Sequence, residues 1–218
     1  MKFKKLSEMQ KLICVSLLFT LSLLAVRVAY TGTMTYLFYP WNLLLALVPF
    51  YFSGLLLKQK KFGWKTILVF ASWFLFLPNA PYLVTDIFHF EERPPVPAWF
   101  DLLLVVSGAW NGVLICMISL FRIEKFLLNR CQIKSPGIIM FLLLISCGYG
   151  IYLGRYLRYN SWDVLTEPVS IIQTSGSHVY HPLRNLNVWL FTLAFAVFLS
   201  IIYFTIKRLP RVLNAEQR

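Results

Sequence analysis

The stretch FDLLLVVSGAWNGVLICMISLF, residues 100–121, decides the fold of this chain. It carries one acid, Asp101, at its start and one amide, Asn111, near its middle, and its other residues are apolar or small. An α-helix needs about 20 mostly apolar residues to cross the hydrocarbon core of a bilayer. The stretch is therefore predicted to be a transmembrane helix, with Asp101 stabilising its first turn and Asn111 bonding a neighbouring helix.

Further apolar runs of similar length lie on both sides of this stretch, at residues 12–30, 37–57, 64–84, 137–157 and 186–206. Only 14% of the 218 residues are charged, whereas soluble domains carry about 25%. We therefore predict an all-α fold, a polytopic transmembrane helical bundle of about six spans that forms a single domain over residues 1–218.

The distribution of basic residues predicts the orientation of this bundle. Six spans place both termini on one side, where sixteen of the 21 Lys and Arg fall. Cytoplasmic loops carry such an excess, so both termini are predicted to be cytoplasmic. The same pattern explains the net charge of +12 without nucleic acid, which we exclude as a partner. The five basic residues predicted on the outer side are Arg27, Arg93, Arg155, Arg158 and Arg184.

Two prolines interrupt the third run, in the motif Pro78-Asn79-Ala80-Pro81. Each proline removes a backbone donor, which frees the carbonyls of Phe74 and Leu77. Unpaired backbone inside a bilayer must face protein or a wet cavity. Asn79 is a candidate ligand-binding residue, and the alternative is that its side chain bonds the freed carbonyls.

A second polar cluster follows the fifth run, at residues 154–163. Arg155 and Arg158 are three residues apart and are predicted to share one helix face, where two guanidiniums suit an anionic phosphate or carboxylate. Asn160 and Asp163 add donors and acceptors to this candidate binding site. The alternative is a pair of arginines that reach the interface, as we also predict for Arg27, or that pair with an acid.

Titratable groups gather on the predicted outer face. Asp86 and His89 are three residues apart and are candidates for acid–base catalysis. With His178 and His181, which are predicted to lie in a polar loop, they are also candidate metal ligands of the kind that zinc accepts. The two pairs are far apart in sequence, so we predict no metal site, and no cofactor is identified.

Three motifs carry a resemblance to a known family. They are Trp41-Asn42-Leu-Leu-Leu-Ala46, Leu77-Pro-Asn-Ala-Pro-Tyr82 with Thr85-Asp86, and Gly154-Arg-Tyr-Leu-Arg158 with Asn160-Ser-Trp-Asp163. The chain resembles an uncharacterised bacterial integral-membrane family catalogued as domain of unknown function 1361. The resemblance implies a multi-pass protein of the bacterial cell membrane and implies no activity.

The leading functional hypothesis is an integral membrane protein with a polar site at the outer leaflet, which binds or transforms an anionic lipid or cell-envelope precursor. The arginines of residues 154–163 would hold the anion, Asn79 and Asn160 would orient it, and Asp86 with His89 would move protons. Two alternatives remain open. One is a non-enzymatic membrane subunit or scaffold whose polar motifs are structural. The other is a small transporter, which with six helices would act as a homo-oligomer.

Overall fold

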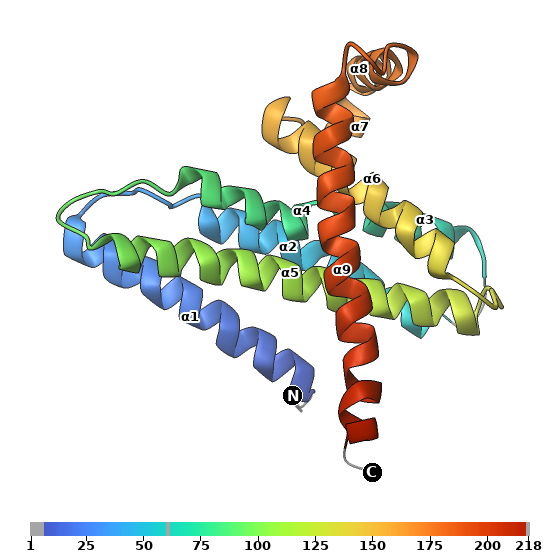
Figure 1. Cartoon of the computed structure of the whole chain (residues 1–218), viewed down its shortest axis with the longest axis horizontal. Helices are drawn as coiled ribbons and strands as arrows, with labels where there is room; N and C mark the ends of the chain where they lie inside the picture. The colour runs from blue at the N-terminus through green and yellow to red at the C-terminus, as the bar shows by residue number, and fades with distance from the viewer. Residues whose placement is uncertain (1–6, 60–61, 217–218) are drawn as a thin grey trace. The chain divides into compact units, whose positions relative to one another are not determined.

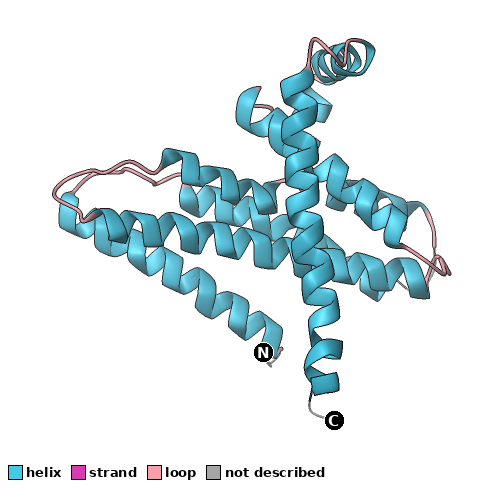
Figure 2. Cartoon of the chain, viewed as in Figure 1, coloured by secondary structure: helices cyan, strands magenta, loops and turns pink. Residues whose placement is uncertain are grey.

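The computed structural model describes residues 7–59 and 62–216, and within these ranges the chain forms helices and loops but no strand (Figure 2). Six helical segments are long and apolar enough to cross a membrane. They are Glu8–Thr31, Tyr39–Lys58, Trp64–His89, Ala98–Asn129, Gly137–Tyr156 and Leu186–Asn214. The prediction of an all-α fold with about six spans is confirmed.

The chain divides into two compact units, Met1–Ser119 and Leu120–Arg218, each described here by itself. The boundary falls inside one long helix, α5 (Ala98–Asn129), which contributes a segment to each unit. The prediction of a single domain stays a prediction. The first unit contains α1 (Glu8–Thr31), α2 (Tyr39–Lys58), α3 (Trp64–Phe76), α4 (Asn79–Tyr82) and the 3₁₀ helix η1 (Leu83–His89) (Figure 1).

In the first unit, α5 is the helix against which the others pack. Two of its glycines let backbone and rings approach closely: a Cβ at Gly108 would lie 2.2 Å from the Tyr39 ring of α2. A Cβ at Gly112 would lie 2.2 Å from the Ala80 carbonyl oxygen of α4. Small residues allow this approach between membrane helices, where packing rather than hydrophobic burial drives association.

A polar seam joins α1 to α5. Thr20 Oγ1 donates to Ser107 Oγ at 2.9 Å. Asn111 Nδ2 lies 2.9 Å from Thr20 Oγ1 and 3.2 Å from the Ser16 carbonyl oxygen. The expected role of Asn111, bonding to a neighbouring helix, is confirmed.

In the second unit, α6 (Gly137–Tyr156) packs against α9 (Leu186–Glu216). Their backbones come closest near Gly148, where a Cβ would lie 2.5 Å from the Thr192 carbonyl oxygen. The segment between them forms α7 (Asp163–Thr166) and α8 (Pro168–Tyr180), and α8 lies crosswise to α9 near its start (Figure 1). The prediction of a polar loop around His178 was therefore wrong, because Pro168 opens a helix that continues to Tyr180.

Two helices run on past the apolar stretches that predict them. The predicted spans 100–121 and 186–206 end within α5 and α9, which continue to Asn129 and Glu216. Lys, Arg and Glu are good helix formers, so a helix need not end where its apolar surface ends. Beyond the apolar runs, Glu124 of α5 and Lys207 of α9 form an ion pair within the second unit.

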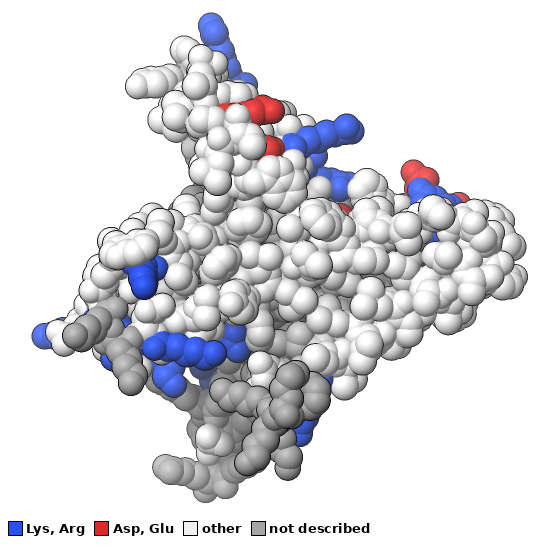
Figure 3. All heavy atoms as spheres, turned by 180° about the vertical axis from the view of Figure 1, so that it is seen from behind, with Lys and Arg blue, Asp and Glu red and all other residues white. Residues whose placement is uncertain are grey.

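The outer faces of the helices are apolar. On α1, Leu12, Val15 and Leu18 are each about 64% exposed, and their spacing of three residues places them on one face. The surface in Figure 3 is correspondingly white over large areas, with charged atoms in separate small patches. Apolar exposure of this extent is expected where lipid rather than water covers a helix.

Candidate functional site

The break in the third predicted span is the first candidate region. The carbonyls of Phe74 and Leu77, which the two prolines were expected to free, are bonded by other backbone groups. Leu77 N–H donates to the Phe74 carbonyl at 3.3 Å, and Ala80 N–H donates to the Leu77 carbonyl at 3.2 Å. Asn79 Nδ2 donates to the Phe76 carbonyl at 3.1 Å. The Asn79 side chain thus bonds a carbonyl of its own break.

Asp86 lies in η1 and is 1% exposed. Asn42 Nδ2, from the first turns of α2, donates to Asp86 Oδ2 at 3.0 Å. From the sequence, Asn42 was only a position of the family motif, and no role was predicted for it. A buried carboxylate needs hydrogen-bond donors. An amide in the first turns of an apolar run is such a donor, and it was the feature of the sequence that could have indicated this bond.

His89 is three residues from Asp86 on the same 3₁₀ helix, where residues at this spacing are eclipsed. Its ring is exposed and lies 5.1 Å from the Phe38 ring, centroid to centroid. The two candidate acid–base residues therefore differ in environment: the carboxylate is buried and the imidazole is exposed.

The first unit also contains a buried ion pair that the sequence did not suggest. Arg27 Nε donates to Asp101 Oδ1 at 2.7 Å and Nη2 donates to Oδ2 at 3.0 Å, and the two side chains are 2% and 1% exposed. The prediction that Arg27 reaches out to the interface was wrong, because Asp101 on α5 provides a bidentate partner inside the unit.

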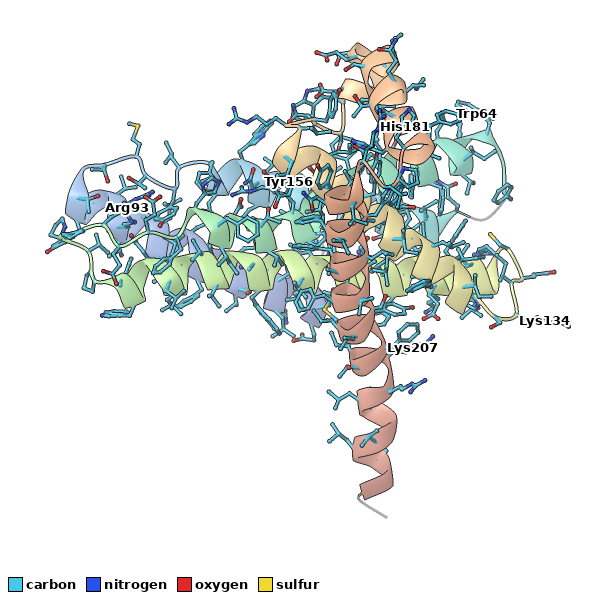
Figure 4. All side chains as sticks on the ribbon, turned by 45° about the horizontal axis from the view of Figure 1, so that its top comes forward. Trp64, Arg93, Lys134, Tyr156, His181 and Lys207 are labelled. Carbon is cyan, nitrogen blue, oxygen red and sulfur yellow. The ribbon has the colours of Figure 1, made fainter. Side chains whose placement is uncertain are left out.

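Tyr36 lies against this ion pair in the loop between α1 and α2. Its ring is 5.0 Å from the Arg27 guanidinium carbon and 5.3 Å from that of Arg93. Burial raises the pKa of Tyr36, and the Asp101 carboxylate raises it further, while the two guanidiniums act in the opposite direction. Figure 4 shows Arg93 in the loop before α5.

In the second unit, α6 ends at Tyr156, between Arg155 and Arg158. Arg155 lies in its last turn and is half-buried, whereas Arg158 follows the helix with φ 60° and is exposed. The prediction that the two share a helix face was wrong, because Arg158 adopts the left-handed conformation that terminates helices. Figure 4 shows Tyr156 at this end of α6.

Asn160 and Asp163 form a turn of their own next to Arg158. Asp163 Oδ2 accepts from the Asn160 backbone N–H at 2.7 Å and from its Nδ2 at 3.3 Å. Asp163 Oδ1 accepts from Thr166 Oγ1 at 3.2 Å. Both oxygens of the carboxylate are thus engaged at the start of α7.

His178 lies on the face of α8 that turns toward α6, and it is 7% exposed. Its Nδ1 is 2.9 Å from Tyr149 Oη, which also donates to Ser175 Oγ at 3.0 Å. Burial lowers the pKa of His178, so the neutral imidazole is favoured. Two more aromatic rings pack around this pair. Tyr152 contacts the His178 ring, and Trp189 stacks on the Tyr149 ring.

His181 ends α8 and is exposed (Figure 4). The two candidate metal pairs belong to different units, Asp86 with His89 in the first and His178 with His181 in the second. Throughout residues 7–59 and 62–216, no group of three or more His, Cys, Asp or Glu side chains could hold a metal ion.

The arrangement has three chemical capabilities. The end of α6 presents exposed positive charge, η1 holds a buried carboxylate, and α8 holds a buried neutral imidazole in contact with the Tyr149 hydroxyl. The molecule has the composition and helices of an integral membrane protein. No curated protein and no solved structure matches the chain. A family model, however, matches residues 41–202, which include all three sequence motifs, and the chain therefore belongs to the family described as protein of unknown function (DUF1361).

Proposed function

We propose that this chain is a multi-pass protein of the bacterial cell membrane that binds the phosphate of an anionic lipid or cell-envelope precursor at the outer end of α6. The observation that carries the proposal is the state of Arg158. It is exposed, it stands clear of the helix, and it makes no ion pair among the described residues. The nearest acid in sequence, Asp163, is engaged by its own turn.

The distribution of charge supports a role for these arginines. Six spans predict that sixteen of the 21 Lys and Arg fall on the side of the termini, which the proposal assigns to the cytoplasm. Basic residues are disfavoured on the opposite side, so the exposed Arg158 needs an explanation other than topology. A phosphate bound by guanidinium groups provides one.

The surface of α8 supports a location at the level of lipid headgroups. Its exposed apolar residues Val169, Ile172 and Val179 fall on one helical face. Its polar residues Ser170 and Ser175 turn toward the protein, where they bond Tyr159 and Tyr149. A helix with its apolar face outward, placed crosswise to a spanning helix, is suited to the membrane interface.

Asp86 and His89 are the proposed proton-transfer pair. A carboxylate buried beside Asn42 and an exposed imidazole one 3₁₀ turn away have the chemistry that acid–base catalysis needs. This assignment concerns the first unit by itself and is independent of the phosphate site proposed at the end of α6.

The second candidate is a non-enzymatic membrane subunit. It is favoured by the bonds that Asn79 and Asp163 make within their own segments, to Phe76 and to Asn160. In this case the polar motifs maintain the helix break and the α6–α7 turn, and no ligand depends on them.

The test measures retention of phosphatidylglycerol and phosphatidylcholine on the purified full-length protein by native mass spectrometry. We expect the wild type to retain phosphatidylglycerol preferentially and Arg158→Ala to weaken this binding about fivefold, because a basic side chain near anionic lipid contributes about 1 kcal/mol. Arg155→Ala is expected to have a similar effect.

Arg184→Ala is the matched control, since it removes an exposed arginine predicted on the same side but outside the site. An equal loss with all three variants would contradict the proposal, because it would indicate charge alone. Lower melting temperatures for Arg155→Ala and Arg158→Ala with unchanged lipid preference would favour the structural subunit.

A further inference from the structure

A groove lies between α6 and α9, away from the candidate site. It has a volume of about 420 Å³. One wall is Phe141 of α6, and the other is a strip of α9 from Val197 to Arg208. The remaining lining residues are Ser200, Ile201, Phe204 and Thr205.

The crossing of the two helices explains why the groove opens. The α6 and α9 backbones touch at Gly148, and Phe141 precedes this contact by two helical turns. Val197 and Arg208 follow the contact along α9. Helices that cross at one close contact diverge on either side of it, and a groove therefore opens toward the terminus side.

The length of the groove matches one leaflet. From Val197 to Arg208 the helix rises about 16 Å, at 1.5 Å per residue. Half of the hydrocarbon core is about 15 Å thick. Arg208 comes just after the apolar run that ends at residue 206, so its guanidinium falls at headgroup level when the run lies in hydrocarbon.

Among the described residues that line the groove, Arg208 is the basic one. Lys207 pairs with Glu124 and lies 5.8 Å from the Tyr203 ring. Arg208 is exposed and makes no ion pair among the described residues. A guanidinium next to a neutralised lysine presents a localised positive charge that suits a phosphate.

We propose that this groove binds an anionic phospholipid of the terminus-side leaflet, with one acyl chain along α9 and the phosphate on Arg208. The acyl chain gains little from the hydrophobic effect, because bilayer hydrocarbon is as apolar as the groove. Selection therefore comes from the headgroup, as it does in basic pockets between membrane helices.

This site is independent of the one at the outer end of α6. It uses other residues and the opposite end of the helix pair, so either proposal can fail without the other. Arg158→Ala tests the first site and Arg208→Ala tests the groove.

The experiment uses the full-length protein in phosphatidylcholine nanodiscs that contain phosphatidylglycerol with a photoreactive diazirine in its acyl chain. After illumination, mass spectrometry maps the labelled peptides. We expect labelling at Phe141 and at residues 197–208, and we expect Arg208→Ala to reduce it about fivefold. Ile201→Trp, which places a large ring in the groove, should reduce it as well.

Three controls make the outcome decisive. Arg130→Ala removes another exposed basic residue predicted on the same side, and Leu190→Trp adds a ring at a lipid-exposed position of α9 outside the groove. Both should leave the labelling unchanged, as should Arg158→Ala. Equal losses with Arg208→Ala and Arg130→Ala, or equal labelling by a phosphatidylcholine probe, would overturn the proposal. Cross-linking of a second copy of the chain at these residues would overturn it too.

Discussion

Arg27 and Asp101 are oppositely charged residues that are both buried, so each needs a partner inside the protein. Each is almost completely inaccessible, and each oxygen of the carboxylate accepts one guanidinium N–H. The Arg27 Nη1 donates to Thr33 Oγ1 at 3.2 Å, so the guanidinium is bonded on more than one side. Buried pairs of this kind are satisfied only while both members are present.

Removing one member is expected to destabilise the protein strongly. Asp101→Ala leaves the Arg27 charge buried without its carboxylate and should cost about 3–5 kcal/mol of unfolding free energy. Chemical unfolding in detergent micelles measures this. Glu91→Ala, which breaks an exposed pair with Arg93, should cost less than about 1 kcal/mol. If the two variants lost the same stability, the buried pair would not have the assigned role.

His178 predicts a dependence of stability on pH. Burial lowers its pKa, so below the ordinary histidine pKa of about 6.5 the unfolded chain binds a proton more readily than the folded chain. Stability from this group is therefore complete above that pH and decreases as the pH falls through the lowered value. Melting temperatures measured from pH 8 to pH 5 should decline less for His178→Gln than for the wild type. His181→Gln should keep the wild-type slope, since His181 is exposed.

At the scale of single residues, the sequence predicted a bonding partner correctly where the surroundings of the side chain favoured one kind of partner. An amide near the middle of an apolar run has to bond a neighbouring helix, and Asn111 does. Arg27 had two choices, the interface or a buried acid, and its partner lies 74 residues further along the chain. Only the fold brings the two together.

At the scale of elements, close helix contacts depend on particular glycines. Gly112 faces the Ala80 carbonyl and Gly148 faces the Thr192 carbonyl, and both of these atoms belong to the backbone. Backbone cannot rotate away from an added methyl group as a flexible side chain can. The helices themselves must therefore separate if either glycine is replaced.

Gly148→Ala is expected to lower stability by about 1–3 kcal/mol, because the added Cβ forces α6 away from α9. Thermal unfolding in detergent measures the change. Gly137→Ala is the matched control on the same helix, since its added Cβ meets nothing within 4 Å. A similar loss in both variants would contradict this packing role, because alanine favours the helix more than glycine does and the Cβ at residue 137 meets no neighbour.

The ends and breaks of elements were less predictable than their existence. Pro78 correctly indicated a break, and the chain passes from α3 to the short helix α4 and then to the 3₁₀ helix η1. The predicted end of α6, at about residue 157, lies within one residue of the observed end at Tyr156. Arg158 lies past both ends, and its left-handed conformation takes it off the helix face that Arg155 occupies.

At the scale of the whole molecule, composition alone was sufficient to predict the class of fold. Runs of about 20 apolar residues have few alternatives to a helix in hydrocarbon, since all backbone groups must be bonded internally. Which helices pack together depends on how their side chains fit, and the length of an apolar run carries no information about that fit. The sequence therefore predicted the spans but not the Gly108, Gly112 and Gly148 contacts.

Topology gives a prediction for intact cells. In a variant with Cys131 replaced by serine, a cysteine at Leu183 should react with a membrane-impermeant maleimide, because this residue is 87% exposed and predicted to be outside. A cysteine at Lys134 should react only after the cells are opened. The reverse pattern would show that the termini face outward.

The buried pair between α1 and α5 also has a consequence for how the protein is made. Arg27 is synthesised 74 residues before Asp101, which at about 5–20 residues per second is an interval of roughly 4–15 s. During that time the first helix carries a cation whose counter-ion does not yet exist, at a cost of about 3 kcal/mol if it sits in hydrocarbon. The nascent first helix must therefore wait in the insertion machinery, or with its arginine in water, until the helix that neutralises it has emerged.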